Sequence, residues 1–296
     1  MTTDSLITIR PLARPEEFHQ AEDVQRSAWH MTGERSIVPL NILLAIQKYG
    51  GLAAGAFDES QPEQPMIGFV LGFLGFTSGG AIKHCSHMLG VIPTAQKSNV
   101  GYRLKAFQRS YVLKQGLDLI TWTYDPLEGM NARLNIGKLG CLARTYHYNF
   151  YGDWADGINQ GLATDRFEVE WWIRSERVES RVERRGQVAF GTLAEAQGRG
   201  YQTILRAVPD KAGIVHPETD TIMVEGKGLI VEIPSSFQTV KLASMTAAKA
   251  WRGETAKLFT TLFAKGYAVV DFVRDEVGRC NAYLLTPTPS EFPPKG

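Results

Sequence analysis

The stretch Val91-Ile-Pro93-Thr-Ala-Gln96-Lys97-Ser98-Asn99-Val100-Gly101-Tyr102-Arg103-Leu104 carries the strongest indication of the fold. A predicted strand ends at Pro93, and a polar loop then opens directly into a predicted helix over residues 100–115. The first N–H groups of a helix have no intrahelical partner, and the helix dipole is positive at that end. The junction therefore predicts a site for a phosphate or pyrophosphate. The alternative is an ordinary strand–helix turn with an N-cap at Ser98 or Asn99.

The residues of this loop narrow the choice of ligand. Gly101 lets a phosphate approach the backbone, and Asn99 tolerates left-handed geometry. The loop follows neither G-x-x-x-x-G-K-[ST] nor G-x-G-x-x-G, the patterns typical of nucleoside triphosphate and dinucleotide sites. Both of those ligands are therefore disfavoured.

Hydrophobic periodicity and turn residues predict a mixed α/β order around the loop. Before the loop we expect helices at 15–29 and 40–48 and strands at 7–12, 52–57, 66–75 and 84–92. After the helix at 100–115 we expect a strand at 117–124, a helix at 131–139, and strands at 145–151 and 167–173. Past Gly186 the pattern restarts, with strands at 203–208, 229–233, 268–273 and 282–286 and a helix at 246–265.

A charged stretch, Arg174–Arg185, separates the two patterns and predicts domains at 1–185 and 186–296. Its opposite charges are interspersed, which favours a solvated helix or linker over a nucleic-acid contact. One pattern occurs in both parts: a helix ending at Gly116, a strand and Asp125 match a helix ending at Gly266, a strand and Asp275. This indicates either a degenerate repeat or a chance match of a generic unit.

Composition bounds the class of protein. The chain has 296 residues, 44% of them hydrophobic, which suits about two globular domains. Lys and Arg total 32 against 31 Asp and Glu, so there is no sequence-wide electrostatic case for nucleic acid or an anionic membrane. The most apolar stretch, Met66–Phe76, has about half the length of a membrane span, and the N-terminus lacks the basic and apolar regions of a signal peptide. We expect a cytoplasmic protein.

The sequence predicts neither a disulfide scaffold nor a metal site. Cys85, Cys141 and Cys280 form no C-x-x-C pair, which favours a reducing compartment. His84 and His87 are three residues apart on a predicted strand and so would face opposite ways. A packed thiol is the favoured interpretation of Cys141 over a nucleophile.

The spacing V-x-P-x-x-Q-x-x-N-x-G-x-x-L resembles the acyl-CoA loop of the GNAT N-acyltransferase superfamily, usually written [QR]-x-x-G-x-[GA] after a V-x-P strand end. Gln96, Asn99 and Gly101 fall on its signature positions, with Asn99 replacing the usual first glycine. The run from Asn131 to Gly140 is similar to the helix after the fifth strand in that superfamily, and the element order agrees. The resemblance covers most of the chain, is strongest at residues 84–152, and extends to a less-studied GNAT-related family of similar total length.

The resemblance implies an α/β fold: a GNAT-like mixed central sheet flanked by helices, with a second, smaller α/β lobe at the C-terminus. It implies an acyl-CoA wedged between splayed fourth and fifth strands, with Asn131 beside the pantetheine arm. Backbone groups of four residues would contact the pantetheine and polarise the thioester carbonyl: Met88, Leu89, Gly90 and Val91. The loop would hold the pyrophosphate through Gln96, Lys97, Ser98, Asn99, Val100, Gly101 and Tyr102.

Acid and base are harder to assign. The tyrosine that often serves as general acid in that superfamily falls here on Ile136. Tyr124, Tyr146 and Tyr148 are the candidate substitutes. Candidate bases are Asp125, Glu128 and His87. Each base has a structural alternative: Asp125 before Pro126 is typical of a turn, Glu128 of a first-turn helix acid, and His87 of a satisfied, partly buried histidine.

We therefore expect an acyl-CoA-dependent N-acyltransferase that acts without a metal. It would move an acetyl or a larger group, such as succinyl from succinyl-CoA, to a small amine, with an amino acid among the candidates. The C-terminal lobe would cap the acceptor side or mediate self-association, for example as a homodimer. The alternative is a non-catalytic GNAT-like module that binds an acyl-CoA and regulates a partner, which Ile136 and Asn99 both favour.

Overall fold

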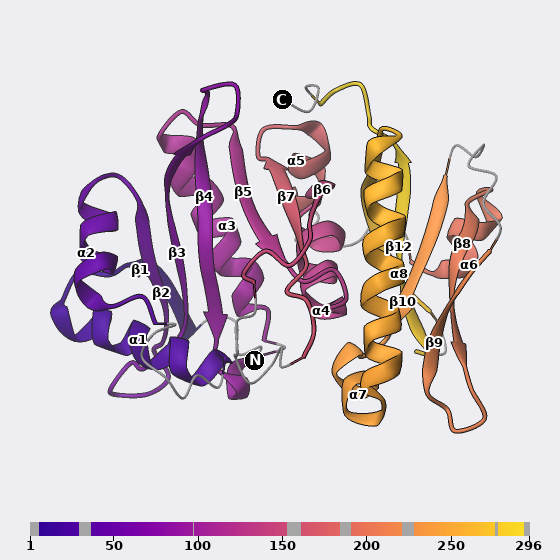
Figure 1. Ribbon diagram of the computed structural model, residues 1–296. Coiled ribbons are helices and arrows are strands. Elements are labelled where there is room, and N and C mark those ends of the chain that lie inside the picture. The colour runs from indigo at the N-terminus through magenta and orange to yellow at the C-terminus, as the bar shows by residue number, and fades with distance from the viewer. Residues whose placement is uncertain are drawn as a thin grey trace. The chain divides into compact units, whose positions relative to one another are not determined.

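The computed structural model describes residues 6–29, 37–96, 98–152, 161–183, 191–220, 228–275 and 278–292. The chain divides into two compact units (Figure 1). The first unit holds the residues up to Trp122 together with 172–174, and the second unit holds 123–171 and the residues from Ser175 on. The predicted boundary at 185–186 lies outside the described residues and stays a prediction. None of the helices in these ranges is both long enough and apolar enough to cross a membrane.

The first unit is built on a mixed sheet in the order β1-β2-β3-β4-β5. Neighbouring strands from β1 to β4 are antiparallel, and β5 runs parallel to β4. The last two residues of β5 belong to the second unit. The elements are β1 (Ile7–Pro11), α1 (Pro15–Trp29), α2 (Leu40–Lys48), β2 (Leu52–Asp58), β3 (Met66–Phe76), β4 (Ile82–Val91), a short 3₁₀ turn η3 (Pro93–Ala95), α3 (Val100–Lys114) and β5 (Leu119–Tyr124).

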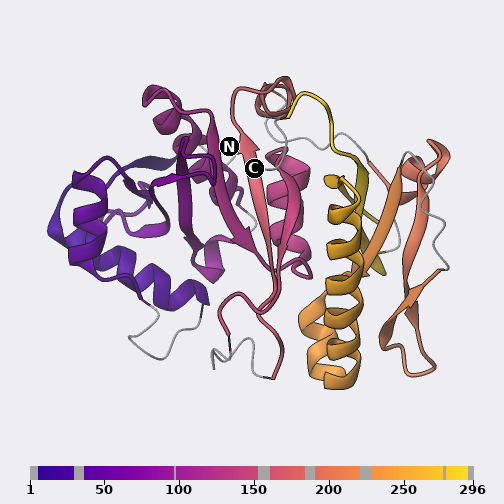
Figure 2. The same cartoon turned by 45° about the horizontal axis from the view of Figure 1, so that its top comes forward.

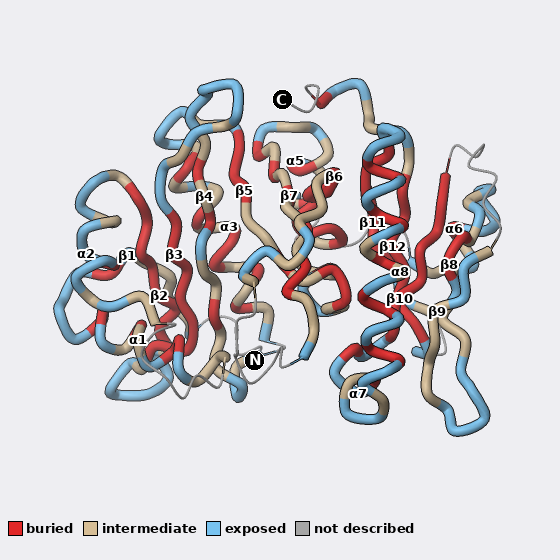
Figure 3. Tube along the Cα trace, viewed as in Figure 1, coloured by how far each residue is buried: buried red, intermediate tan, exposed pale blue. Residues whose placement is uncertain are grey.

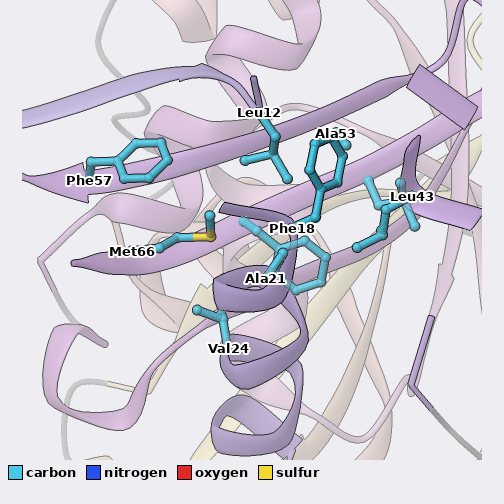
Figure 4. Packing of buried hydrophobic residues seen from close by; sticks show 10 residues of the cluster. Leu12, Phe18, Ala21, Val24, Leu43, Ala53, Phe57 and Met66 are labelled. Atoms are coloured by element: carbon cyan, nitrogen blue, oxygen red, sulfur yellow. The ribbon is translucent and has the colours of Figure 1, made fainter. Parts of the chain in front are cut away.

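Helices cover both faces of this sheet (Figures 1 and 2). On one face, Phe18, Ala21 and Val24 of α1 and Leu43 of α2 pack against β2 and β3 (Figure 4). On the other face, Val100 and Leu104 of α3 pack against a second cluster from the same strands: Leu52, Ala54, Ala56, Ile67 and Val70. Figure 3 shows the resulting run of buried positions along β2 and β3. Burial on both faces explains why these strands read as continuous apolar runs.

Within the second unit the strands follow one another in the order β7-β6-β11-β12-β10-β8-β9, with mixed directions. Neighbours are antiparallel except β8 and β10, which are parallel. Its elements are α4 (Gly129–Ala132), a π-helical segment η4 (Arg133–Lys138), β6 (Leu142–His147), β7 (Arg166–Trp172), α5 (Glu176–Glu183), α6 (Leu193–Gly198), β8 (Gln202–Pro209), β9 (Val215–Thr219), β10 (Leu229–Pro234), α7 (Phe237–Ala243), α8 (Met245–Ala264), β11 (Tyr267–Arg274) and β12 (Cys280–Pro287). The predicted class, a mixed α/β sheet flanked by helices, is confirmed.

An aromatic cluster forms the centre of the second unit's core. Phe167 of β7 lies edge-on to Phe259 of α8, with ring centroids 4.6 Å apart, and to Tyr283 of β12, at 5.5 Å. Such edge-to-face pairs stabilise a core beyond the area that they bury. These contacts join α8 to β7, and β7 to β12, within the second unit.

The charged stretch at 174–185 corrects one expectation. Part of it is helical, as α5, but Arg181 is buried and Arg177 is half-buried, so neither is fully solvated. Arg181 pairs with Asp271 of β11 at 2.8 Å, and Arg177 donates to the carbonyl of Gly140 at 2.9 Å and to that of Val270. The two arginines are one helical turn apart and thus reach the same strand. Charge patterning alone does not distinguish such a pair from a solvated helix face.

Candidate functional site

β4 contains a β-bulge at its middle. Met88 pairs with Leu71 of β3, but Ser86 pairs with the next residue, Gly72, so His87 is an extra residue in β4. A bulge bends its strand and re-aims the side chains around it, and bulges are common next to functional sites. The sequence gives no indication of this irregularity.

β4 and β5 pair over a short distance. His84 pairs with Ile120 and Cys85 with Thr121, in parallel register. Beyond them, Ser86 and the residues from Met88 to Val91 pair with β3. β4 thus leaves β5 just before the bulge, which is the splayed arrangement expected for these two strands. The second half of β4 holds Met88, Leu89, Gly90 and Val91, whose backbone groups we expected to bind pantetheine.

Hydrogen bonds between nearby residues hold the loop after β4. The Ser98 hydroxyl donates to the Ala95 carbonyl at 2.5 Å, and the Gln96 amide donates to the Val91 carbonyl at 3.4 Å. Asn99 has a left-handed backbone, with φ +63°, and its side chain makes no capping hydrogen bond. Asn99, the N-cap residue, therefore does not make the side-chain cap expected in the ordinary-turn alternative. Lys97 lies outside the described residues.

The start of α3 leaves backbone donors available. Its first bond to the loop joins the Arg103 N–H to the Asn99 carbonyl at 3.1 Å. The N–H groups of Val100, Gly101 and Tyr102 precede that bond, in the positions that have no partner within a helix. Arg103 itself anchors the turn, because its guanidinium donates to the Ile7 carbonyl at 2.6 Å.

A buried polar group lies where β4 and β5 begin to separate. The Lys105 ammonium donates to the Ser86 hydroxyl at 2.7 Å and to the Gln108 side-chain oxygen at 3.1 Å, and it lies 3.4 Å from the centroid of the Trp122 ring. Gln108 also contacts His84 at 3.1 Å. Burial, and then the charge of Lys105, lower the pKa of His84 to about 4, so its ring is neutral near pH 7. Sequence reasoning gave Lys105 no role.

His87 has an apolar neighbour. Its ring centroid lies 5.9 Å from that of Phe73, and desolvation of the ring lowers the pKa of His87. A histidine in this state is neutral near pH 7 and able to accept a proton.

Asp125 follows β5 directly and is held by an arginine from α8. Its two carboxylate oxygens accept from the two terminal nitrogens of Arg252, each at 2.7 Å. It also accepts from the Leu127 N–H at 2.9 Å, as a turn aspartate does, and Arg166 approaches to 3.9 Å. The sequence separates Asp125 and Arg252 too widely for any local pattern to predict their pairing.

Glu128 lies at the start of α4, where its side chain makes no capping hydrogen bond. It accepts instead from the Gln238 side chain of α7 at 2.6 Å. Burial, and then the charge of Asp125, raise the pKa of Glu128, while Gln238, Arg252 and Lys241 act in the opposite direction. The balance favours a carboxyl that takes up a proton more readily than usual.

The tyrosines considered as acids lie in different environments. The Tyr124 hydroxyl is buried 3.2 Å from that of Tyr283, which in turn donates to the Pro126 carbonyl at 2.7 Å. Tyr146 donates to Asp165 at 2.5 Å, and burial raises the pKa of both Tyr124 and Tyr146. Tyr148 is exposed.

The remaining predicted positions lie on or just after α4. Asn131 is exposed on that helix. Ile136, in the position of the usual acid, is fully buried in the π-helical segment that follows. π-helical turns are rare and often occur near functional sites. In the part of the chain that the structure describes, no cluster of His, Cys, Asp and Glu could hold a metal ion.

No family model and no curated protein matches the sequence. Solved structures do match, among them a putative acetyltransferase of the GNAT family from Desulfovibrio desulfuricans, at 17% identity and a TM-score of 0.43, over 56% of this chain and 99% of that one. A second is YncA from Salmonella typhimurium, a putative acetyltransferase solved with acetyl-CoA. It matches at 15% identity and a TM-score of 0.45, over 58% of this chain and 95% of that one. A third is the ribosomal-protein-S18-alanine N-acetyltransferase from Escherichia coli. It matches at 15% identity and a TM-score of 0.43, over 56% of this chain and 94% of that one. The matching structures include GNAT acetyltransferases, the superfamily whose motifs the sequence resembles.

Proposed function

We propose that this chain is an acyl-CoA-dependent N-acyltransferase of the GNAT type. The observation that carries the proposal is the course of β4, which bulges at His87, leaves β5 and then runs through a tight loop into a helix start without a side-chain cap. Such a helix start offers N–H groups and a positive dipole to a pyrophosphate. The motif residues Gln96, Asn99 and Gly101 occupy this same loop.

The proposal assigns the donor's two ends to consecutive segments of the first unit. Backbone groups of Met88, Leu89, Gly90 and Val91 would contact the pantetheine and the thioester. N–H groups of Lys97, Ser98, Asn99, Val100, Gly101 and Tyr102 would hold the pyrophosphate, with Gln96 beside them.

The reaction needs positioning and one proton acceptor. A neutral amine forms a bond to the thioester carbon, the carbon–sulfur bond breaks, and the sulfur leaves as a thiolate. The nitrogen loses a proton on forming the amide, and the thiolate takes up a proton to give free CoA. Because an ammonium cannot attack, a base must first remove its proton. Glu128 is our leading candidate for that base, ahead of Asp125 and His87.

The transferred group is acetyl or a larger acyl such as succinyl, and the acceptor is a small amine, with an amino acid among the candidates. The proposal gives no acid role to Tyr124, because its hydroxyl is buried against Tyr283.

Calorimetric titration with acetyl-CoA, succinyl-CoA and free CoA tests the proposal, with Gly101→Glu as the test variant. A carboxylate at the start of α3 would repel the pyrophosphate, so we expect micromolar binding to the wild type and a loss of at least ~100-fold in the variant. Gly198→Glu is the matched control, because Gly198 is an exposed glycine of α6 with open space around its Cβ position. A folded wild type that binds no CoA species would refute the proposal.

A second candidate function is a non-catalytic module that binds an acyl-CoA and regulates a partner. Buried Ile136 in place of the usual tyrosine favours it. A screen of amines that measures release of free thiol separates the two. Turnover with any amine supports the enzyme, whereas tight acyl-CoA binding without turnover across the screen supports the regulatory module.

A further inference from the structure

Side chains from the C-terminal helices surround the two carboxylates that follow β5. Arg252 comes from α8 and Gln238 and Lys241 from α7, while Asp125 and Glu128 lie more than a hundred positions earlier in the sequence. All of these residues belong to the second unit. Side chains of α7 and α8 thus contact residues that follow β5, within the stretch 84–152 where the sequence most resembles the GNAT superfamily.

Both carboxylate oxygens of Asp125 accept hydrogen bonds from Arg252. The side chains of Asp125 and Arg252 are 11% and 4% exposed, and two parallel hydrogen bonds of 2.7 Å join them. The guanidinium also lies 5.1 Å from the centroid of the Phe237 ring of α7. Removing either partner of such a buried, two-bonded pair would leave the other charge without compensation. Asp125 is therefore the counter-ion of Arg252.

Glu128 is held less completely. Its carboxylate accepts one short hydrogen bond, from Gln238. The charged or titratable groups that influence it are Asp125 after β5, Arg252 of α8, Lys241 of α7 and Tyr283 of β12. Negative Asp125 favours the protonated form of Glu128, and positive Arg252 and Lys241 favour the ionised form. Burial is the largest cause of the raised pKa of Glu128, and the charges of Asp125 and Arg252 then act on it in opposite directions.

We propose that the C-terminal helices tune the proton-transfer group of this protein: Arg252 and Gln238 are positioning residues, Asp125 is a fixed counter-ion, and Glu128 is the carboxyl that accepts the proton. The assignment of Glu128 as the base for the acceptor amine rests on the proposed acyltransferase function. In that step an ammonium N–H bond breaks, the proton forms an O–H bond on Glu128, and the electron pair stays on nitrogen. The proton is later returned to solvent or to the departing thiolate, which regenerates the carboxylate.

The test is a ¹³C NMR titration of the full-length protein with labelled glutamate carboxyls, in which Glu128 is assigned by the signal missing from Glu128→Gln. Arg252→Gln leaves Asp125 without its cation, so the measured pKa of Glu128 should rise by at least ~0.5. Asp125→Asn removes the neighbouring anion, so the pKa should fall by a similar amount. In the double variant Asp125→Asn/Arg252→Gln both charges are gone, and the pKa should return close to the wild-type value.

Two further variants keep the test decisive. Lys257→Gln removes an exposed cation from the same helix and should leave the Glu128 titration unchanged. Gln238→Leu removes the hydrogen bond to the carboxylate and should raise the pKa of Glu128, which provides a second test if Arg252→Gln does not fold. The proposal would be overturned if the pKa of Glu128 stayed the same in these variants or shifted in the same direction in all of them. A general loosening of the packing around Glu128 cannot produce shifts of opposite sign.

Kinetics then separates this inference from the proposed function. The acidic limb of kcat/KM reports the essential base of the free enzyme, so it should move to higher pH in Arg252→Gln and to lower pH in Asp125→Asn. If the limb does not follow the NMR values, Glu128 is not the base. If the NMR values shift as expected but no donor and amine pair gives turnover, the acyltransferase function and the base role both fall, and the electrostatic arrangement stands.

Discussion

Two segments of the molecule share a local pattern and differ in what surrounds it. α3 and α8 both end before a glycine with positive φ, +77° at Gly116 and +82° at Gly266, and each leads through a strand to an aspartate at the same spacing. Their beginnings differ. α8 starts at Ser244, whose side chain accepts from the Ala247 N–H at 3.2 Å, whereas Asn99 makes no such bond at the start of α3.

The ends of the two strands differ as well. Asp125 after β5 is locked onto buried Arg252, while Asp275 after β11 pairs at 3.4 Å with Arg279, a largely exposed residue four positions away. Their neighbours also differ, because β5 lies parallel to β4 but β11 lies between antiparallel β6 and β12. The helix–glycine–strand pattern that the two segments share therefore indicates only that both helices end in the same way. The function of each segment depends on the contacts at its helix start and at the aspartate after its strand. Whether the second segment is a degenerate repeat stays a prediction.

The largest difference should appear between the two aspartates. Asp125→Ala leaves a buried arginine without its counter-ion and should lower the free energy of unfolding by about 3–5 kcal/mol. Asp275→Ala removes a weak, partly exposed ion pair and should cost about 1 kcal/mol or less. Urea denaturation of both variants checks this. Equal losses would mean that the buried Asp125–Arg252 pair does not form in solution.

The two helix starts should separate stability from ligand binding. Ser244→Ala removes a side-chain cap and should cost about 1 kcal/mol of stability, with CoA binding unchanged. Asn99→Gly should raise stability by up to about 1 kcal/mol, because glycine adopts the left-handed backbone at φ +63° without strain. It should also retain CoA binding, since the N–H groups stay in place. Thermal unfolding and calorimetry measure the two effects, and a loss of CoA binding in Ser244→Ala would argue against assigning the ligand to α3.

These contrasts show what local sequence reveals. Capping residues, glycine stops and apolar periodicity predicted most helices and strands closely, α1 and α2 to the residue, because each depends on neighbours within a few positions. The short elements α6, β9 and α7 were missed, since such segments carry little periodicity. The bulge at His87 and the burial of Lys105 and Arg181 also escaped prediction, because each depends on a partner strand or helix distant in sequence.

The same limit applies to the candidate site. The loop at 96–102 and the carboxylates Asp125 and Glu128 could be found from motif and position. Their electrostatic surroundings could not, because Arg252 and Gln238 stand in helices with no recognisable relation to the motif. Nothing in the local sequence distinguishes Asp125, held by two short hydrogen bonds, from Asp275.

The smallest expected difference lies where the two segments agree. Gly116→Ala and Gly266→Ala each place a Cβ on a left-handed residue with no heavy atom within 4 Å of the new position, so backbone strain is the expected main cost. Each substitution should lower the free energy of unfolding by about 1 kcal/mol, and the two values should agree closely. Parallel urea denaturation of the two variants measures both. A much larger loss at one glycine would show that its helix stop is coupled to the surrounding structure, which would break the one feature that the two segments share.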